Sequence, residues 1–279
     1  MTGPWRHLVS DNPLMERALR AFAIRKNFRN MPASTWIVFS LVALIYVVLI
    51  GLGVRYADSV EPSLFLYLML TVLILVGATV LHNALAGERE KRTLDLLLVA
   101  PVTAKQIVAA KLVKVIVPTL VIVVICVIPT IVLQLVRQHL GVDYSTRTVS
   151  FWAALTMSVV ITLSTVLMVT GSTLYISSLN RTTASALTAT LGVLLFWFVI
   201  VPIFIGTIGV VSQDVSDALA TYHPYVALTK AVGGDSNHWS VGFSFICSSL
   251  LHLGIGVAGL VLTTWKLERE RKTGSTVNA

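Results

Sequence analysis

The chain has 279 residues, of which 56% are hydrophobic and only 12% are charged. Soluble domains carry about 25% charged residues, so this composition excludes an ordinary soluble enzyme or binding domain. The formal charge of +8 needs no nucleic-acid partner to explain it, because anionic membrane lipids attract Lys and Arg at their surface.

Residues 1–33 form a basic arm that precedes the first apolar run. Asn12 is a candidate helix cap with Pro13 at the first helical position, and apolar side chains up to Phe22 then share one face. We expect an amphipathic helix in the headgroup layer, anchored by Arg17, Arg20 and Phe22. The alternative is a solvated basic tail.

Six stretches of the chain are long enough to cross a bilayer and contain no Asp, Glu, Lys or Arg. A membrane helix needs about 20 mostly apolar residues. The predicted spans are residues 34–54, 63–86, 115–136, 148–179, 182–211 and 241–265. Residues 34–265 are therefore expected to form a six-helix transmembrane domain of an all-α integral membrane protein, with a bend at Pro202.

Lys and Arg are distributed unequally between the two sides of the predicted bundle. The N-terminal arm, the loops after the second and fourth spans, and the tail at residues 266–279 hold 17 of the 21 Lys and Arg. Because positively charged loops are retained in the cytoplasm, we expect both termini to be cytoplasmic and the loop at residues 212–240 to lie outside.

A dense charged block at residues 87–111 separates the second and third spans. Leu94, Leu97 and Leu98 fall at positions i, i+3 and i+4, so they share one side of a short helix. Because a run of charge is costly in hydrocarbon, we expect a cytoplasmic helix that binds a partner protein through its leucines. The alternative is that the leucines cover the base of this subunit's own bundle and the charges are solvated.

No Asp, Glu, Lys or Arg lies within the six predicted spans. Gradient-driven carriers and voltage sensors use such charges, so the sequence disfavours both. His82 and His252 can titrate there, and for each we favour a neutral ring that is hydrogen-bonded to a neighbouring helix.

Hydroxyl groups recur at helical spacing in the fourth span and are candidates to line a polar pathway. They belong to Ser158, Thr162, Thr165 and Ser172. The favoured alternative is that they bond to their own backbone or let helices approach closely. We expect Gly254 and Ala258 of the sixth span to be a small-residue packing pair of the same kind.

Several catalytic and metal-binding motifs are missing. The sequence has no phosphate-binding Gly-x-x-x-x-Gly-Lys-Ser/Thr loop, no His-Glu-x-x-His helix and no Gly-x-Ser-x-Gly turn. We therefore expect that the chain is not an enzyme and binds no ATP or metal itself. Cys126 and Cys247 lie within predicted spans, where a disulfide is not expected.

The charged block resembles the coupling segment of the ABC-2 type permeases, the membrane subunits of one group of ATP-binding-cassette (ABC) transporters. The matching residues are Glu88, Glu90, Thr93, Leu94, Asp95, Leu97, Leu98, Pro101 and Lys111. The chain departs from the family pattern at Arg92, where Gly is usual, and at Asp95, where Glu is usual. The layout is also similar: an interfacial helix, two spans, the coupling segment and four more spans.

The resemblance implies a permease subunit of an exporter in the bacterial cytoplasmic membrane. Two such subunits, identical or different, would pair around the substrate pathway, each seated on a separately encoded ATPase subunit that binds ATP and Mg. The residues expected to couple to the ATPase are Glu88, Arg89, Glu90, Arg92, Leu94, Asp95, Leu97, Leu98 and Pro101. Their leucines would pack in an ATPase groove, the two glutamates would pair with its basic groups, and the arginines would meet acidic groups or lipid phosphate.

Two other functions stay open from the sequence. A gradient-driven carrier or channel without an ATPase would have to use His82, His252 or the hydroxyl face for selectivity. A non-transporting membrane anchor would use the charged block only for docking. Transport that requires both ATP and a partner ATPase distinguishes the permease from these alternatives.

Overall fold

The computed structural model describes residues 63–141, 149–209, 212–233 and 238–277, together with Val47, Gly51 and Arg55. This part of the chain is helical and contains no strand, as the sequence predicts. The first predicted span, residues 34–54, lies outside it apart from Val47 and Gly51. So does the predicted N-terminal helix with Arg17, Arg20 and Phe22, and both therefore stay predictions.

Five helical segments of the described part are long and apolar enough to cross a membrane. They are Ser63–Glu90, Ala104–His139, Phe151–Leu179, Thr183–Gly209 and Ser240–Thr273. These segments correspond to the last five predicted spans, and the chain is therefore a multi-pass integral membrane protein.

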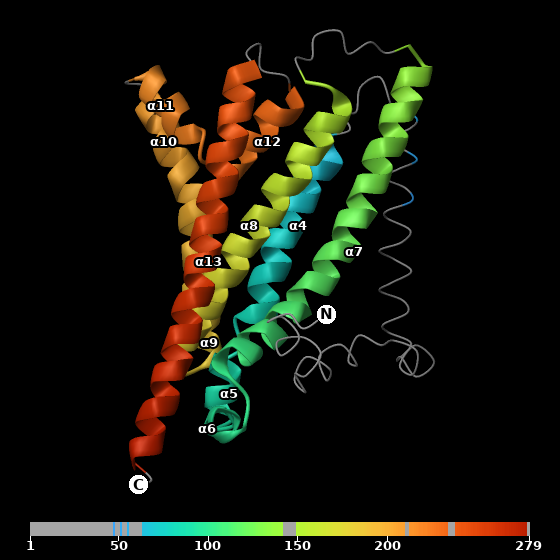
Figure 1. Cartoon of the computed structure of the whole chain (residues 1–279). Helices are drawn as coiled ribbons and strands as arrows, with labels where there is room; N and C mark the ends of the chain where they lie inside the picture. The colour runs from blue at the N-terminus through green and yellow to red at the C-terminus, as the bar shows by residue number, and fades with distance from the viewer. Residues whose placement is uncertain are drawn as a thin grey trace, which may run out of the picture.

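Four long helices run along one another in the bundle (Figure 1): α4 (Ser63–Leu81), α7 (Ala104–His139), α8 (Phe151–Leu179) and α13 (His238–Val277). α8 packs against both α4 and α13. Side chains of α4 with no solvent exposure, such as Met69, Leu70 and Leu73, belong to the main hydrophobic core. The core therefore lies where α4 meets α7 and α8.

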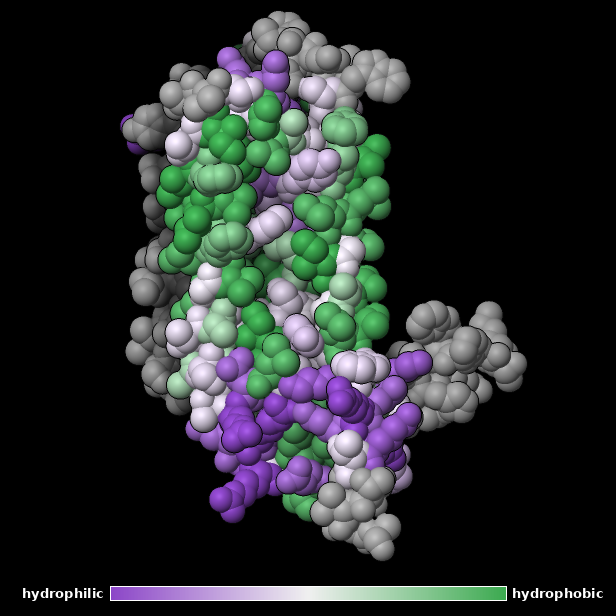
Figure 2. Space-filling view, turned by 90° about the vertical axis from the view of Figure 1, so that its left-hand side faces the viewer, coloured by the Kyte–Doolittle hydropathy of each residue, from purple (hydrophilic) through white to green (hydrophobic). Residues whose placement is uncertain are grey.

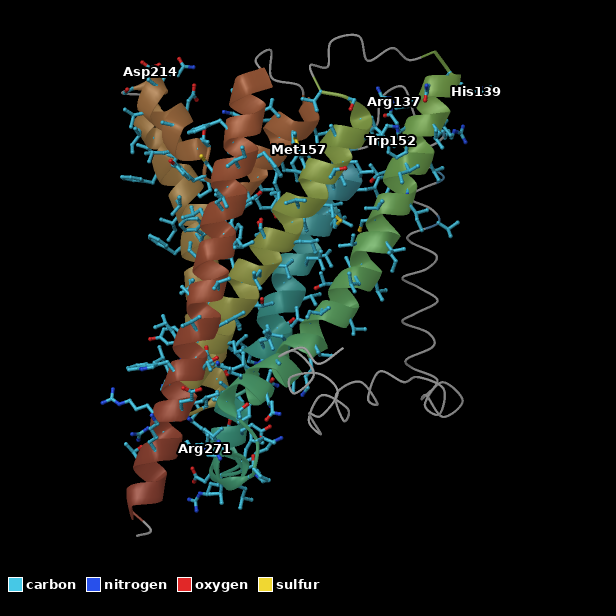
Figure 3. All side chains as sticks on the ribbon, in the orientation of Figure 1. Arg137, His139, Trp152, Met157, Asp214 and Arg271 are labelled. Atoms are coloured by element: carbon cyan, nitrogen blue, oxygen red, sulfur yellow. The ribbon has the colours of Figure 1, made fainter. Side chains whose placement is uncertain are left out.

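Two short helices, α5 (Ala86–Glu90) and α6 (Leu94–Val99), connect α4 to α7 at the end of the bundle where α13 also terminates (Figure 1). We call this the α5–α6 end. Hydrophilic side chains gather there, below a broad hydrophobic band (Figure 2). Arg271 lies at this end, whereas Arg137, His139 and Asp214 lie at the opposite end (Figure 3).

α8 and α13 approach closely enough for their backbones to touch. A Cβ atom added to Gly171 would lie 2.2 Å from the carbonyl oxygen of Gly256. A Cβ atom added to Gly259 would lie 2.5 Å from the backbone of Gly171. Small residues permit such close crossings in membrane helices, where backbone proximity increases van der Waals contact.

Within the described part of this subunit, Gly254 and Ala258 do not form the predicted packing pair with a neighbouring helix. Both residues are exposed, and a Cβ atom on Gly254 would meet nothing within 4 Å. α13 carries small residues on more than one face, and it is the face with Gly256 and Gly259 that meets α8.

The span after α8 contains a π-helical turn. It consists of α9 (Thr183–Leu195), the π-helix η3 (Phe196–Ile200) and α10 (Val201–Gly209). The Val201 amide donates to the Phe196 carbonyl, five residues back. Proline has no amide hydrogen and its ring crowds the preceding turn, so the wider turn lets the helix continue past Pro202.

Part of the predicted outer loop, residues 212–240, is helical. α11 (Gln213–Ala220) follows α10, and α12 (Pro224–Gly233) packs against α8 and α13. The Tyr225 hydroxyl lies 2.6 Å from Thr71 Oγ1, and the Tyr67 hydroxyl donates to Thr229 Oγ1 over 2.9 Å. These contacts join α12 to α4. Neither helix is long enough to span a membrane, so apolar length in the sequence does not predict them.

Candidate functional site

The candidate site is the connection between α4 and α7, which contains all nine predicted coupling residues. Arg92 lies between α5 and α6 with a φ of 57°, in the left-handed region that glycine adopts without penalty. This is the position at which the ABC-2 pattern has Gly. The backbone therefore makes the turn that a glycine would favour, with an arginine in its place.

Arg92→Gly is expected to stabilise the subunit slightly. A residue with a Cβ atom in the left-handed region costs about 1 kcal/mol, and the greater flexibility of glycine in the unfolded chain offsets part of the gain. We expect a net increase of about 0.5 kcal/mol in the free energy of unfolding, measured by thermal unfolding in detergent. Arg92→Lys keeps both charge and strain and should leave the Tm unchanged, whereas a lower Tm for Arg92→Gly would contradict the strained turn.

The start of α5 is held by a serine from α8. Ser177 Oγ accepts hydrogen bonds from the backbone amides of Leu85 and Ala86, each over 3.0 Å, and all three residues are fully buried. The N-cap residue of α5 is Leu85, whose side chain offers no acceptor. Ser177 therefore satisfies amides that helix starts leave unpaired, a role that sequence reasoning missed.

The two glutamates expected to face an ATPase have partners within the subunit. Glu88 Oε1 accepts from Lys111 Nζ over 2.9 Å, and Glu88 Oε2 accepts from Thr93 Oγ1 over 2.5 Å. Glu90 Oε2 accepts from the amide of Thr183 over 2.9 Å and from its hydroxyl over 2.7 Å. A carboxylate at the first residue of α9 is favoured by the helix dipole. Pairing of Glu88 and Glu90 with an ATPase stays a prediction.

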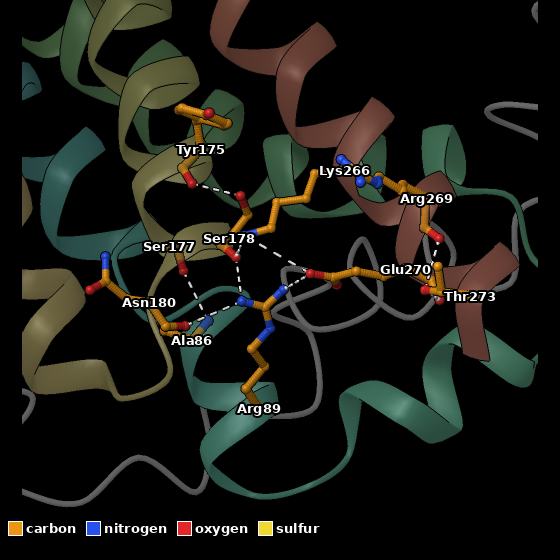
Figure 4. Close-up of polar contacts among 10 residues, drawn as sticks. All are labelled: Ala86, Arg89, Tyr175, Ser177, Ser178, Asn180, Lys266, Arg269, Glu270 and Thr273. Atoms are coloured by element: carbon orange, nitrogen blue, oxygen red, sulfur yellow. Dashed lines mark hydrogen bonds and ion pairs between the residues drawn. The ribbon is translucent and has the colours of Figure 1, made fainter. Parts of the chain in front are cut away.

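Arg89 points into a polar network at the end of α8 (Figure 4). Its guanidinium donates to Glu270 Oε1 on α13 over 2.5 Å and to the Ser178 carbonyl. Lys266 Nζ, also on α13, donates to the same Ser178 carbonyl over 2.5 Å. Glu270, Lys266 and Ser178 could not be predicted as partners of Arg89, because nothing in the local sequence pattern relates them to it.

Three leucines of α6 point towards the bundle, whereas the fourth leucine and the valine of this helix point away from it. Leu94 is buried, and Leu97 and Leu98 are half-buried against the main core. In contrast, Leu96 is 73% exposed and Val99 is 82% exposed. The predicted leucine face thus covers the base of this subunit, which is the alternative placement from the sequence.

A cleft of about 470 Å³ opens beside α6. It is lined by Arg89, Arg92, Leu94, Asp95, Leu98, Glu270 and Thr273. The remaining predicted coupling residue, Pro101, is exposed in the link to α7. Five of the nine predicted coupling residues and the end of α13 therefore border one cleft.

Comparison with protein families gives a match over nearly the whole chain. The model of the family described as ABC-2 family transporter protein matches residues 10–266. The chain belongs to the ABC-2 transporter family. A search of curated proteins finds no match. An ABC-2 permease is the membrane component of a transporter that pairs in general with ABC ATPase subunits, and it is not itself an ATPase.

The candidate pathway hydroxyls of this ABC-2 permease are bonded to their own helix. Ser158 donates to the Ala154 carbonyl over 2.7 Å, and Thr162 donates to the Ser158 carbonyl over 2.8 Å. Thr165 and Ser172 donate in the same way to carbonyls three or four residues back. Ser158, Thr162 and Thr165 have no exposure and Ser172 is half-buried, so their role in a pathway stays a prediction.

The two histidines of the permease spans are in different surroundings. His252 is fully buried, with its Nδ1 3.2 Å from Ser248 Oγ and its ring edge-on to Trp197. His82 follows the end of α4, and its Nδ1 lies 2.8 Å from the Thr79 carbonyl of that helix. Within the described part of the chain, the hydrogen bonds of both rings are thus local and not with a neighbouring helix, the partner that we favoured from the sequence. Within the described ranges, no group of three or more His, Cys, Asp and Glu residues is placed to hold a metal ion.

Proposed function

We propose that the chain is the permease subunit of an ABC exporter in the bacterial cytoplasmic membrane. In this proposal two permease subunits, identical or different, form the substrate pathway. Separately encoded ATPase subunits bind ATP and Mg and drive the transport. The α5–α6 end faces the cytoplasm, which agrees with the excess of Lys and Arg predicted on that side.

The observation that carries the proposal is the pair of exposed aliphatic side chains on α6. Leu96 and Val99 are three residues apart, so they share one face of the helix. They belong to α6, which lies at the α5–α6 end of the bundle (Figure 1). This end is hydrophilic and adjoins the hydrophobic band that lipid would cover (Figure 2). Large exposed apolar side chains with a charged rim are typical of protein interfaces, and an amphipathic helix commonly docks in a groove of its partner.

The orientation of α6 changes which residues we propose to contact the ATPase. Leu94, Leu97 and Leu98 attach α6 to the permease, while Leu96 and Val99 are the side chains that an ATPase groove would receive. Burying one leucine is worth about 1.5–3 kcal/mol. Arg92 and Asp95 are also exposed and are the charged groups that remain available beside this pair for an ATPase.

Leu96→Asp is expected to weaken ATPase association at least about tenfold, since a loss of 1.4 kcal/mol in binding free energy already has that effect. The measurement is the amount of ABC ATPase that co-purifies with the reconstituted permease, together with the ATP-dependent transport of the complex. Because Leu96 is exposed, the Tm of the permease alone should not change.

Leu140→Asp is the matched control, because Leu140 is an exposed leucine just beyond the opposite end of α7. It should retain the ATPase fully. Normal ATPase binding by Leu96→Asp would overturn the assignment of the contact. Solute movement driven by membrane potential without ATP would overturn the proposed function and favour a gradient-driven carrier.

A further inference from the structure

We infer that Glu270 is a positioning residue that fastens the α5–α6 segment (residues 86–99) to α13, so that this segment, α13 and α8 move as one unit. The inference rests on the proposed function, because it identifies which membrane helices receive the motion of an attached ATPase. Glu270 lies outside the residues that the ABC-2 pattern singles out.

The end of α13 lies against the base of the bundle. Leu267 has no solvent exposure and belongs to the main core. Lys266 and Glu270 lie one turn apart, with Lys266 Nζ 3.9 Å from Glu270 Oε1. The buried leucine fixes the rotation of α13, and this rotation presents both charged side chains to α8 and α5.

Glu270 is the carboxylate between two cations at this site. The carbonyl of Ser178, in the last turn of α8, accepts from both Arg89 and Lys266. The end of a helix carries partial negative charge, but one carbonyl does not neutralise two full charges. Glu270 contacts both cations. Without its carboxylate, the cations would repel each other and release α5 from α13.

The ion pair of Arg89 and Glu270 is shielded enough from solvent to help hold α5 against α13. Their side chains are 18% and 32% exposed, whereas fully exposed ion pairs contribute little because water and salt screen them. Arginine also presents several donors in a fixed plane, so it holds the Ser178 carbonyl and Glu270 together.

A second contact holds the other flank of the α5–α6 segment. Arg271 donates to the Val102 carbonyl over 3.1 Å, in the link between α6 and α7. α13 therefore contacts the chain both before and after α6. A displacement of α6 by a partner would pull on α13 at two points.

The glycine contact would carry this displacement to α8. At Gly171, Gly256 and Gly259 the two helices touch through backbone atoms, which cannot rotate aside as side chains do. α8 and α13 are therefore expected to shift together. The candidate pathway hydroxyls lie on α8, so the unit connects the docking surface to the predicted pathway.

Hydrogen–deuterium exchange on the isolated permease in lipid nanodiscs tests the fastening directly. Glu270→Gln should speed exchange of the amides at residues 86–99 about tenfold. Glu268→Gln is the matched control, since Glu268 is exposed and points to the opposite side of α13. Unchanged exchange in Glu270→Gln would overturn the inference whether or not an ATPase binds.

A charge exchange tests whether the pair itself is responsible. Arg89→Glu alone should speed exchange as Glu270→Gln does, and the double variant Arg89→Glu with Glu270→Arg should return it to within about twofold of the original protein. Failure of the double variant to restore protection would show that the ion pair does not hold the segment, and would overturn the inference.

Distances in the complex with the ATPase then test the common motion. Spin labels at the exposed residues Lys91 and Glu268 should keep a constant separation between the nucleotide-free and ATP-bound complexes, and Glu270→Gln should make that separation change. A change in the original protein would overturn the inference. Failure of any ATPase to bind would instead contradict the proposed function, while the exchange result on the isolated permease would stand.

Discussion

Replacing Gly256 with alanine is expected to separate α8 from α13 and to destabilise the folded protein strongly. The new methyl group would lie 2.6 Å from the backbone of Leu167, closer than real Cβ contacts occur. No rotamer change relieves a clash with backbone, so the helices must move apart along their interface. We expect a loss of about 3 kcal/mol or more, against a total stability of about 5–15 kcal/mol for a typical protein.

Gly171→Ala should have the same effect from the other side of the interface, because its methyl group would lie 2.2 Å from the Gly256 carbonyl oxygen. The measurement for both variants is the yield of monodisperse protein in detergent and the midpoint of its thermal unfolding. Similar losses of yield and stability in the two variants would show that the stability of the interface depends on the close backbone contact and not on one residue alone.

Gly254→Ala is the control on the same helix. The added methyl group meets nothing within 4 Å, and alanine favours a helix by up to about 1 kcal/mol over glycine. This variant is therefore expected to be neutral or slightly stabilising. The opposite result would be a large loss of stability from Gly254→Ala and none from Gly256→Ala. It would contradict the structure, in which the face of α13 with Gly256 meets α8.

Apolar length predicts the spans because burial in hydrocarbon requires about 20 apolar residues in a row. The predicted span at residues 148–179 agrees closely with α8. α7 begins at Ala104, well before the predicted start at residue 115, because Thr103 and Gln106 form a capping box there. The N-terminal part of α7 contains Lys105 and Lys111, so the length of the charge-free stretch underestimates the length of this helix.

The contacts of the candidate site were not predictable from local pattern. The leucine spacing predicts α6, but the side that is buried depends on residues far along the chain. Arg89 and Glu270 are 181 positions apart, and Leu85 and Ser177 are 92 apart. Periodicity carries information about the faces of one helix and none about its neighbours.

Ser177→Ala is expected to lower the free energy of unfolding by about 2–4 kcal/mol. The substitution leaves the amides of Leu85 and Ala86 buried without their acceptor, and each unsatisfied buried group costs about 1–3 kcal/mol. Alanine cannot compensate, since it offers no acceptor. The start of α5 should loosen first, because both amides belong to it, and exchange at residues 85–90 should rise before global unfolding.

Ser178→Ala is the control for Ser177→Ala, because it also removes a serine hydroxyl at the end of α8 but not the one that caps α5. The Ser178 hydroxyl donates to the Tyr175 carbonyl of its own helix, while its backbone carbonyl, which Arg89 and Lys266 use, survives the substitution. We expect a change within about 0.5 kcal/mol, measured by thermal unfolding beside Ser177→Ala. Equal losses in the two variants would show that Ser177 does not cap α5. A loss of stability in Ser177→Ala alone would show that one buried hydroxyl of α8 holds the start of α5. This hydroxyl lies near the ion pair that connects α5 to α13.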